Sequence, residues 1–391
     1  MSEHRIVTEN RHFGRYLRRI REDRKLSLDA VEEMTMGYPE PVTKSHLSRI
    51  ENGRAVPTFP RMFALCQIYG VPISSMAERF ETDLRRGDRI SIDATDPDRF
   101  LGRLSQLRKA GRHDSILSLT ASALESLSES DAHDSNELFT TITIWHIQAM
   151  IKLGHYESAK VKSEKILSQT PNDSEAHLRA LICFVMTSYR LKRFAVALMG
   201  LRQISQLLDK GEWEPSLCAT AHGIQGPVHH AIGDLDRAKE CFESSIELFR
   251  KAGNGYEACK ARINLGQVLI DTNSLGAARR HLTQSLEYAS DEKFDWLISL
   301  ATSHLTVLNY KHGSVESAES YALRSNALAR PNGYRTILFR NIFYLWQIAL
   351  DKEDLTAMNS NERTLRALSN RIHDSFPELD QFRRFAEGGD Q

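Results

Sequence analysis

The stretch Val42-Thr-Lys-Ser-His-Leu-Ser-Arg-Ile-Glu-Asn-Gly-Arg54 decides the fold at the N-terminal side of this chain. Thr43 can cap a short helix, because its hydroxyl can accept a hydrogen bond from a free backbone N–H in the first turn. Gly53 can end that helix, since glycine adopts the left-handed conformation at little cost. Leu47 and Ile50 lie three residues apart and are expected to face a core. The stretch therefore predicts a short helix with one buried face and one polar face.

Four further short helices are predicted around this one. Phe13, Leu17 and Ile20 follow a helical period, and the opposite face of their helix is rich in arginine. The other helices are expected at residues 28–34 after a cap at Ser27, from Thr58 onward with Pro60 in the first turn, and at residues 73–84. The segment between the second and third helices contains Gly37, Pro39 and Pro41, which break a helix.

Five short helices with a turn in the middle resemble the phage-repressor-like (XRE, Cro-type) helix-turn-helix domain. The residues that carry the resemblance are Leu26-Ser-Leu28, the 42–54 stretch, Pro57-Thr-Phe-Pro60 and Tyr69-Gly-Val-Pro72. In this family the third helix lies in the major groove of DNA. The resemblance implies base reading by Lys44, Ser45 and Arg49, and phosphate contacts by Thr43, Asn52, Arg54, Arg15, Arg18 and Arg19. Glu51 is expected to tie the domain together internally instead of touching DNA.

Two features depart from the family pattern. The second helix usually begins with Gln and carries a small Ala where it crosses the third, whereas this chain has Leu28 or Asp29 and Glu32 at those places. The connection Met36–Pro41 is also longer than the usual tight turn. The departures predict a different crossing of the two helices, and they keep open the alternative of a degenerate domain that no longer binds DNA.

A turn of the form Gly/Asn-x-hydrophobic-x-x-small recurs along the rest of the chain. It is found at Gly154–Ala159, Gly233–Ala238, Asn273–Ala278 and Gly313–Ala318, and the last three turns start 40 residues apart, at 233, 273 and 313. Weaker copies are Gly111–Ile116, Arg193–Ala197 and Glu353–Met358. Each is interpreted as a loop between two amphipathic helices, whose small residue lets the paired helices approach closely. A fixed period of this length is the signature of a repeat protein.

This pattern resembles a tetratricopeptide (TPR) array of seven degenerate units over residues 97–375, closed by a capping helix near 376–385. The predicted organisation is all-α: a helix-turn-helix domain at 1–85, a linker at 86–98 and a TPR-like α-solenoid at 99–391. Residues predicted to line the solenoid groove are Asn264, Gln267, Asp271, His304, Arg340, Asn341 and Gln347. Amide side chains suit an extended peptide because each offers a donor and an acceptor. Ordinary solvated helix surface stays the alternative for each of them.

Composition limits the function classes. The 51 Lys and Arg residues balance 51 Asp and Glu residues, but residues 1–90 hold 16 basic against 13 acidic side chains, leaving 35 against 38 in the remainder. The small basic excess therefore sits in the DNA-binding candidate. Five scattered cysteines indicate neither a disulfide framework nor a zinc site. No phosphate-binding loop, nucleotide fingerprint or hydrolase motif is present, so we expect no enzyme activity, cofactor or metal. The sequence predicts no membrane segment, and it predicts a cytoplasmic location.

The whole architecture resembles the RRNPP type of peptide-sensing regulator (Rap, Rgg, NprR, PlcR, PrgX). The resemblance implies a homodimer on a two-fold double-stranded DNA operator, with a short peptide or protein effector in the solenoid groove. The alternative from another functional class is a TPR scaffold that sequesters a protein partner and carries a degenerate helix-turn-helix.

Overall fold

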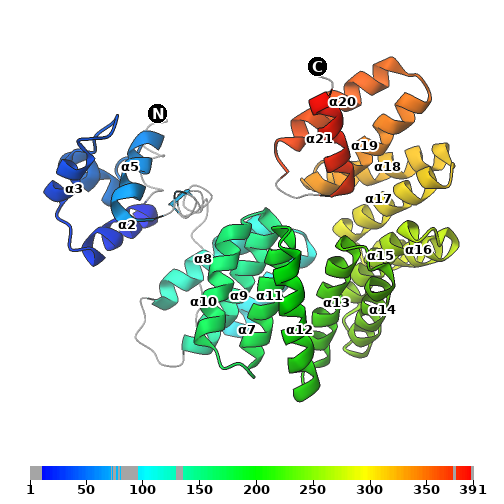
Figure 1. Ribbon diagram of the computed structural model, residues 1–391, viewed down its shortest axis with the longest axis horizontal. Helices are drawn as coiled ribbons and strands as arrows, with labels where there is room; N and C mark the ends of the chain where they lie inside the picture. The colour runs from blue at the N-terminus through cyan, green and yellow to red at the C-terminus, as the bar shows by residue number, and fades with distance from the viewer. Residues whose placement is uncertain are drawn as a thin grey trace. The chain divides into compact units, whose positions relative to one another are not determined.

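The computed structural model describes residues 11–71, 73, 76, 77, 80, 96–128, 135–372 and 376–388. Within these ranges the chain consists of helices and their connections and contains no strand, as the all-α prediction requires (Figure 1). The chain divides into two compact units, Met1–Phe100 with Asp114–Ile142 and Leu101–His113 with Thr143–Gln391. Most of the predicted fifth helix and of the predicted linker lies outside the described residues, so the boundaries at 85 and 98 stay predictions.

The head, defined here as residues 11–71, has four helices at the positions predicted for them. They are α2 (Arg11–Asp23), α3 (Leu28–Thr35), α4 (Lys44–Glu51) and α5 (Phe59–Tyr69). Ser27 caps α3 by accepting from the backbone N–H of Ala30 at 3.0 Å, as predicted. Leu17, Leu47 and Ile50 are fully buried in the core of the head. Burial of one apolar face on each helix is what holds such short helices in place.

The long connection between α3 and α4 is fixed by hydrogen bonds. Thr35 Oγ1 accepts from the backbone N–H of Val42 at 3.0 Å and lies 3.3 Å from the carbonyl oxygen of the same residue. Glu40 accepts from the hydroxyl of Thr58 at 2.7 Å and lies 3.6 Å from Arg61. The additional residues that the sequence places here are thus bonded to α3 and to the start of α5.

A glycine sets the distance between α2 and α4. A Cβ atom added at Gly14 would lie 2.4 Å from the carbonyl oxygen of Ile50 and 2.5 Å from that of Glu51. Both distances are far below van der Waals contact, and both neighbours are backbone atoms that cannot turn away. The close crossing of the head therefore depends on the absence of a side chain at this position.

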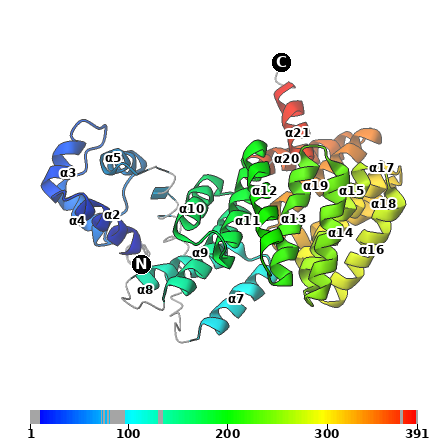
Figure 2. The ribbon, with the colours of Figure 1, turned by 60° about the horizontal axis from the view of Figure 1, so that its bottom comes forward.

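Outside the head the described chain is helical. Helices α10 to α20 form consecutive neighbours joined by short turns, and α13 to α17 follow one another as adjacent rods in both views (Figures 1 and 2). The helices are α7 (Pro97–Lys109), α8 (His113–Ser128), α9 (Ser135–Leu153), α10 (Tyr156–Gln169), α11 (Glu175–Arg190), α12 (Phe194–Lys210), α13 (Pro215–Ala231), α14 (Leu235–Lys251), α15 (Gly255–Asp271), α16 (Leu275–Asp291), α17 (Asp295–Lys311), α18 (Val315–Ala329), α19 (Arg335–Asp351), α20 (Leu355–Ser369) and α21 (Pro377–Gly388).

Each of the seven turns predicted from the repeat falls between two of these helices. In every one a residue has positive φ: Gly111, Gly154, Lys192, Gly233, Asn273, Gly313 and Glu353. A left-handed residue ends the first helix of the pair and reverses the chain within a few residues. Two of the three weaker copies have Lys192 or Glu353 in place of glycine at this position, which explains why those two turns gave a weaker sequence signal.

Small residues lie at the contacts between paired helices. The alanines predicted for this role, Ala159, Ala197, Ala238, Ala278 and Ala318, are fully buried. A Cβ added at Gly226 would lie 2.5 Å from Cζ of Phe242, and one added at Gly266 would lie 2.6 Å from Cδ2 of Leu282. These two pairs occupy equivalent positions in successive repeats. In each pair the glycine of the first helix leaves room for the large side chain of the second.

Candidate nucleic-acid interface and effector site

Helix α4 is positioned by its caps and its buried face. Thr43 is the N-cap residue, and its hydroxyl accepts from the backbone N–H of His46 at 3.2 Å. Asn52 follows the last turn and donates from its side chain to the carbonyl oxygen of Ser48 at 2.7 Å. Gly53 has positive φ, which ends the helix as predicted. The exposed face of α4 is therefore held in one orientation relative to the core of the head.

All nine residues predicted to touch DNA lie on the surface of the head. They are Lys44, Ser45 and Arg49 for base edges, and Thr43, Asn52, Arg54, Arg15, Arg18 and Arg19 for phosphates. Several of them already have partners within the head: Lys44 pairs with Asp29, Arg18 pairs with Glu22 at 2.8 Å, Asn52 bonds to Ser48, and Thr43 accepts from His46. Arg18 is exposed, and its hydrogen bond with Glu22 raises the pKa of its guanidinium. Their roles on DNA stay predictions.

A buried ion pair joins the end of α4 to α2. Arg21 donates from Nε to Glu51 at 2.7 Å and from Nη2 to the second carboxylate oxygen at 2.9 Å. The Glu51 side chain is only 4% exposed. The pair raises the pKa of the Arg21 guanidinium, chiefly through the hydrogen bond to Glu51. Glu51 thus ties the head together internally, as the sequence analysis expected, and it is not available to DNA.

Two acidic side chains of α3, Asp29 and Glu32, contact the start of α4, and neither contact was predicted. Lys44 Nζ lies 2.7 and 2.9 Å from the two carboxylate oxygens of Asp29, and this contact raises the pKa of the Lys44 ammonium. Glu32 accepts from the backbone N–H of Lys44 at 3.1 Å. The two positions that depart from the family pattern therefore supply negative charge to the N-terminal end of α4, where a carboxylate is favoured by the helix dipole.

Several of the predicted groove residues form one connected set across four helices of the solenoid, α13, α15, α17 and α19. We call this set the polar ladder: His230, Gln267, Asp271, His304, Lys311 and Arg340. Asp271 accepts from Gln267 at 2.8 Å, and its carboxylate lies 2.9 Å from both His230 Nε2 and Lys311 Nζ. His304 Nδ1 lies 2.8 Å from the Gln267 carbonyl oxygen, and its Nε2 lies 3.4 Å from Arg340. Lys311 and Asp271 are 40 residues apart, at equivalent places in successive repeats.

The charges of the ladder follow from burial and partners. Burial opposes the ionisation of Asp271, but hydrogen bonds from His230, Gln267 and Lys311 hold its pKa well below the ordinary value. Burial lowers the pKa of His304 far below its usual range, and the Arg340 guanidinium lowers it further. His304 is therefore neutral near pH 7, and its bond to the Gln267 carbonyl places the proton on Nδ1, so that Nε2 can accept from Arg340.

Asn341 is a correction to the predicted groove. Its side chain is fully buried and donates to Asn326 of α18 at 2.9 Å, so it lies between paired helices and no ligand can reach it. Among the described residues, the amides of Asn264 and Gln347 make no hydrogen bond, and both side chains are partly exposed. Arg340 Nε lies 3.3 Å from Glu378 of α21 but makes no well-directed hydrogen bond. Asn264 and Gln347, which lie outside the polar ladder, therefore keep hydrogen-bonding capacity that the ladder residues use on one another.

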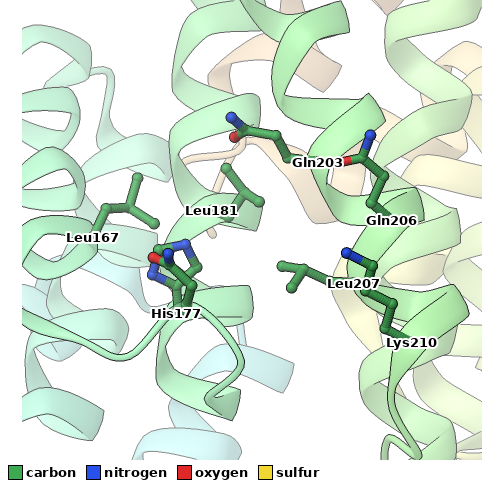
Figure 3. Close-up of a pocket in the computed structure, with 8 residues that line it drawn as sticks. Leu167, His177, Leu181, Gln203, Gln206, Leu207 and Lys210 are labelled. Atoms are coloured by element: carbon green, nitrogen blue, oxygen red, sulfur yellow. The ribbon is translucent and has the colours of Figure 1, made fainter.

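A hollow of about 450 Å³ between α10, α11 and α12 was not predicted. It is lined by Leu167, Asn172, His177, Leu181, Gln203, Gln206, Leu207 and Lys210. Leu167 and Leu207 point toward one another across it, while the amides of Gln203 and Gln206 lie toward one side (Figure 3). The lining residues come from separate helices with no shared motif, so no sequence signal could have identified the hollow.

The described residues hold neither a candidate metal site nor a candidate membrane-spanning helix. No group of three or more His, Cys, Asp or Glu side chains is arranged there to hold a metal ion. None of the helices in these parts of the chain is long and apolar enough to cross a lipid bilayer.

Comparison with known proteins agrees with this architecture. Residues 140–375 match the MalT-like TPR region family, and residues 12–78 match a helix-turn-helix domain family. No curated protein sequence matches the chain. The solved structure of Rap protein complexed with competence and sporulation factor has 16% identity and a TM-score of 0.59, with 74% of this chain and 81% of that chain covered. This likeness shows a shared fold of the helical repeats.

Two further solved structures are similar at a lower TM-score. PlcR of Bacillus thuringiensis in complex with the peptide PapR7 and DNA has 15% identity and a TM-score of 0.42, covering 73% of this chain and 99% of that chain. The apo form of RapI has 13% identity and a TM-score of 0.49, with 71% of this chain and 77% of that chain covered. The family matches, which cover more than half of the chain, carry the assignment: this chain belongs to the MalT-like TPR family, with a helix-turn-helix domain ahead of the repeats.

Proposed function

We propose that this protein is a sequence-specific DNA-binding transcriptional regulator. One observation carries the proposal: α4 buries Leu47 and Ile50 completely, and it exposes Lys44, Ser45 and Arg49 on its other face. A capped helix with such a face can enter the major groove, where Lys and Arg donate to the guanine acceptors. The exposed residues Thr43, Asn52, Arg54, Arg15, Arg18 and Arg19 would fix the register through phosphates.

The test begins with genome-wide capture of DNA by the full chain, which identifies a bound sequence. Replacing Arg49 with Ala is then expected to weaken binding to that sequence by about 1–3 kcal/mol at fixed salt, because one base contact is lost. Arg324→Ala on the exposed surface of α18 is the matched control and should leave binding unchanged. Equal affinity of the Arg49 variant and the wild type would show that α4 does not read bases.

The solenoid is proposed to bind a peptide or protein effector along the polar ladder. Asn264 and Gln347 can bond to the main chain of an extended peptide, since neither amide has a partner in the described part of the chain. Arg340 can take a ligand carboxylate, because its pairing with Glu378 is long and incomplete. Rap protein, which shares the fold of the helical repeats, was solved in complex with competence and sporulation factor, and this supports the solenoid as the place of an effector.

The effector proposal can be tested on protein purified from cells by mass spectrometry of any peptide that accompanies it. The double variant Asn264→Ala, Gln347→Ala is expected to lose the bound peptide. Asn332→Ala is the matched control, because Asn332 lies in the turn before α19 and donates to the carbonyl oxygen of Leu328. A peptide that stays with the double variant would place the effector site elsewhere.

The regulator is proposed to act as a homodimer on a two-fold operator, with the effector shifting the equilibrium between DNA-competent and incompetent dimers. Such a shift requires different effector affinities in the two states. Light scattering on the complex with the captured DNA should give two chains per duplex. One chain per duplex, with an operator that lacks two-fold symmetry, would contradict this arrangement.

A second candidate function is a TPR scaffold that sequesters a protein and whose head no longer binds DNA. The acidic residues Asp29 and Glu32 favour it, because they place negative charge at the end of α4 that would approach a phosphate backbone. Gel shifts with genomic fragments separate the candidates. Specific, salt-dependent retention supports the regulator, whereas no retention together with stoichiometric capture of a protein supports the scaffold.

A further inference from the structure

The C-terminal end of α7 contacts helices that follow it by more than a hundred residues. The hydroxyl of Tyr334, just before α19, donates to the carbonyl oxygen of Ala110 at 3.5 Å. Arg108 Nη1 lies 3.5 Å from the carboxylate of Glu257 in α15. Lys109 Nζ lies 6.0 Å from the centre of the Phe294 ring, just before α17. All of these residues belong to the same compact unit, so α7 reaches the starts of three later helices.

Gly111 fits this contact in two ways. Its φ of +70° is the left-handed conformation that the turn after α7 requires. A Cβ added there would lie 3.2 Å from Cε1 of Tyr334 and 3.7 Å from Cδ1 of Trp296. Gly313, in the equivalent turn between α17 and α18, has a φ of +80° but no atom within 4 Å of such a Cβ. The two glycines thus share a backbone conformation and differ only in what faces them.

The ionic part of the contact is incomplete on the side of α7. Glu257 is buried, and burial opposes its ionisation, but Lys260 and Arg108 hold its pKa below the ordinary value. Lys260, on the same helix, forms the shorter pair with Glu257. The Arg108 side chain remains 35% exposed, and its Nε makes no hydrogen bond within the described structure. Glu257 therefore keeps a cationic partner if Arg108 leaves.

These contacts differ from those inside the helix stack. Paired helices interlock through fully buried side chains such as Phe242 and Leu282 against glycine. The end of α7 is held by two polar contacts at 3.5 Å, by the face of a partly exposed tyrosine, and by Arg108 and Lys109 over the rings of Trp145 and Phe294 at 5.2 and 6.0 Å. Polar contacts at this distance are weak, and their groups can bond to water when they separate. The contact can open without exposing the core of any repeat.

We propose that Arg108–Gly111, docked on Glu257, Phe294, Trp296 and Tyr334, form a reversible latch. The latch holds α7 against the starts of α15, α17 and α19, and it opens without unfolding the repeats. Helix α7 begins at Pro97, within the predicted linker 86–98, so the latch lies at the far end of the helix that follows the linker. The latch itself stands apart from the proposed function, whereas its influence on DNA binding rests on that function.

Hydrogen exchange of the full chain compares Gly111→Ala with Gly313→Ala. Both variants strain a left-handed turn equally, but only the first pushes a side chain into Tyr334. Gly111→Ala is expected to raise deuterium uptake several-fold in peptides covering 255–260, 294–298 and 334–338, and Gly313→Ala to raise it only near its own turn. The same uptake in both variants at the three distant segments would overturn the latch.

A second variant tests the latch in case Gly111→Ala unfolds the turn after α7. Tyr334→Ala removes the ring that faces Gly111 without changing the backbone of the α7 turn. It is expected to increase acrylamide quenching of tryptophan fluorescence, because Trp296 loses its cover, while the thermal unfolding transition keeps its cooperativity. Unchanged quenching, or loss of the cooperative transition, would show that the contact is a fixed part of the core.

The regulatory consequence has its own readout. If the captured DNA is bound by the wild type, Gly111→Ala should change the affinity for it at least several-fold, and Gly313→Ala should not. Distant exchange that rises without a change in affinity would reject the regulatory consequence and leave the latch itself supported. A wild type that binds no DNA would count against the proposed function, and the exchange comparison would still decide on the latch.

Discussion

The head and the solenoid both use glycine to bring helices close together, but against different neighbours. Gly14 of the head faces the backbone carbonyl groups of Ile50 and Glu51 at 2.4 and 2.5 Å from its virtual Cβ. Gly266 of the solenoid faces the flexible side chain of Leu282 at 2.6 Å. A backbone carbonyl at the end of a helix cannot move without moving the helix, whereas a leucine can change rotamer. The head is thus built to hold one geometry, and the solenoid can adjust.

This difference suits the two proposed tasks. A base-reading helix needs a fixed position, because contacts to base edges depend on the register of the helix in the groove. A repeat array that responds to an effector needs small displacements that accumulate along the stack, since each repeat contacts only its neighbours. Substitutions in the head and in the solenoid can test whether the first is rigid and the second adjustable, and the largest effect is expected in the head.

Gly14→Ala should break the head. We expect a loss of at least about 3 kcal/mol in the stability of the head, because overpacking against backbone has no side chain to absorb it. Gly102→Ala in α7 is the matched control: it is also inside a helix, but nothing lies within 4 Å of the added Cβ. It should stabilise by about 0.5–1 kcal/mol through helix propensity. The measurement is urea unfolding of the full chain, followed by hydrogen exchange in peptides from α2 and α4.

Gly266→Ala should cost less, about 1–3 kcal/mol, because Leu282 can repack around the new methyl group. The control is Gly276→Ala in α16, where the added Cβ meets no atom within 4 Å. Thermal unfolding with peptide-resolved exchange would assign the loss to α15 and α16. A loss equal to that of Gly14→Ala would remove the proposed distinction between rigid and adjustable crossings.

Asp271→Asn should destabilise the solenoid by about 1 kcal/mol at pH 7, since the side chain is 26% exposed and its bonds are partly screened. Hydrogen bonds from His230, Gln267 and Lys311 outweigh burial and depress the pKa of Asp271. A depressed carboxyl pKa stabilises the fold above the unfolded value of about 3.9 and loses that contribution as the pH falls below it.

The gap between wild type and Asp271→Asn should therefore be widest at neutral pH and should narrow below about pH 4. Denaturant midpoints measured from pH 7 to pH 3 would follow this change. Asp291→Asn, at an exposed position at the end of α16, provides the control with no pH-dependent gap. A gap that widens toward low pH would contradict the assigned role of the ladder.

Asp29→Asn should have the smallest effect on stability, a few tenths of a kcal/mol, because its pair with Lys44 is exposed on both sides. The substitution should change the affinity for DNA more clearly than it changes stability. Removing the carboxylate frees Lys44, so affinity should rise a few-fold and depend more steeply on salt. Asp23→Asn at the end of α2 is the control for a change of net charge. An unchanged salt dependence would place Lys44 away from DNA.

Local features were predictable from the sequence, and contacts between distant segments were not. The bounds of α4, its cap at Thr43 and its buried Leu47 and Ile50 follow from neighbouring residues. The repeat turns follow for the same reason, even where Lys192 or Glu353 replaces glycine. The contact of Glu32 with Lys44 spans a connection of unusual length, and the sequence showed only that a familiar Gln and Ala were missing.

The polar ladder was predicted only in part. The period placed Gln267, His304 and Arg340 at comparable positions, and the structure joins them. The same period placed Asn341 in the groove, although it is buried against Asn326. Adjacent residues on a helix point about 100° apart, so a register error of one position exchanges groove and core. The latch depends on how far each repeat rotates against the next, and no single repeat encodes that rotation.

The interlocking of glycine with a large partner has a consequence for how this array could be rearranged. In the pair α13 and α14, glycine is on the first helix, where Gly226 receives Phe242. In the pair α11 and α12 the arrangement is reversed, and a Cβ on Gly200 of the second helix would lie 2.5 Å from Cγ2 of Val185 on the first. Counted from the turns at Lys192 and Gly233, Val185 occupies the place of Gly226, so joining α11 to α14 would set Val185 against Phe242. Recombination can therefore exchange whole helix pairs in this protein, but α11 cannot replace α13 opposite α14.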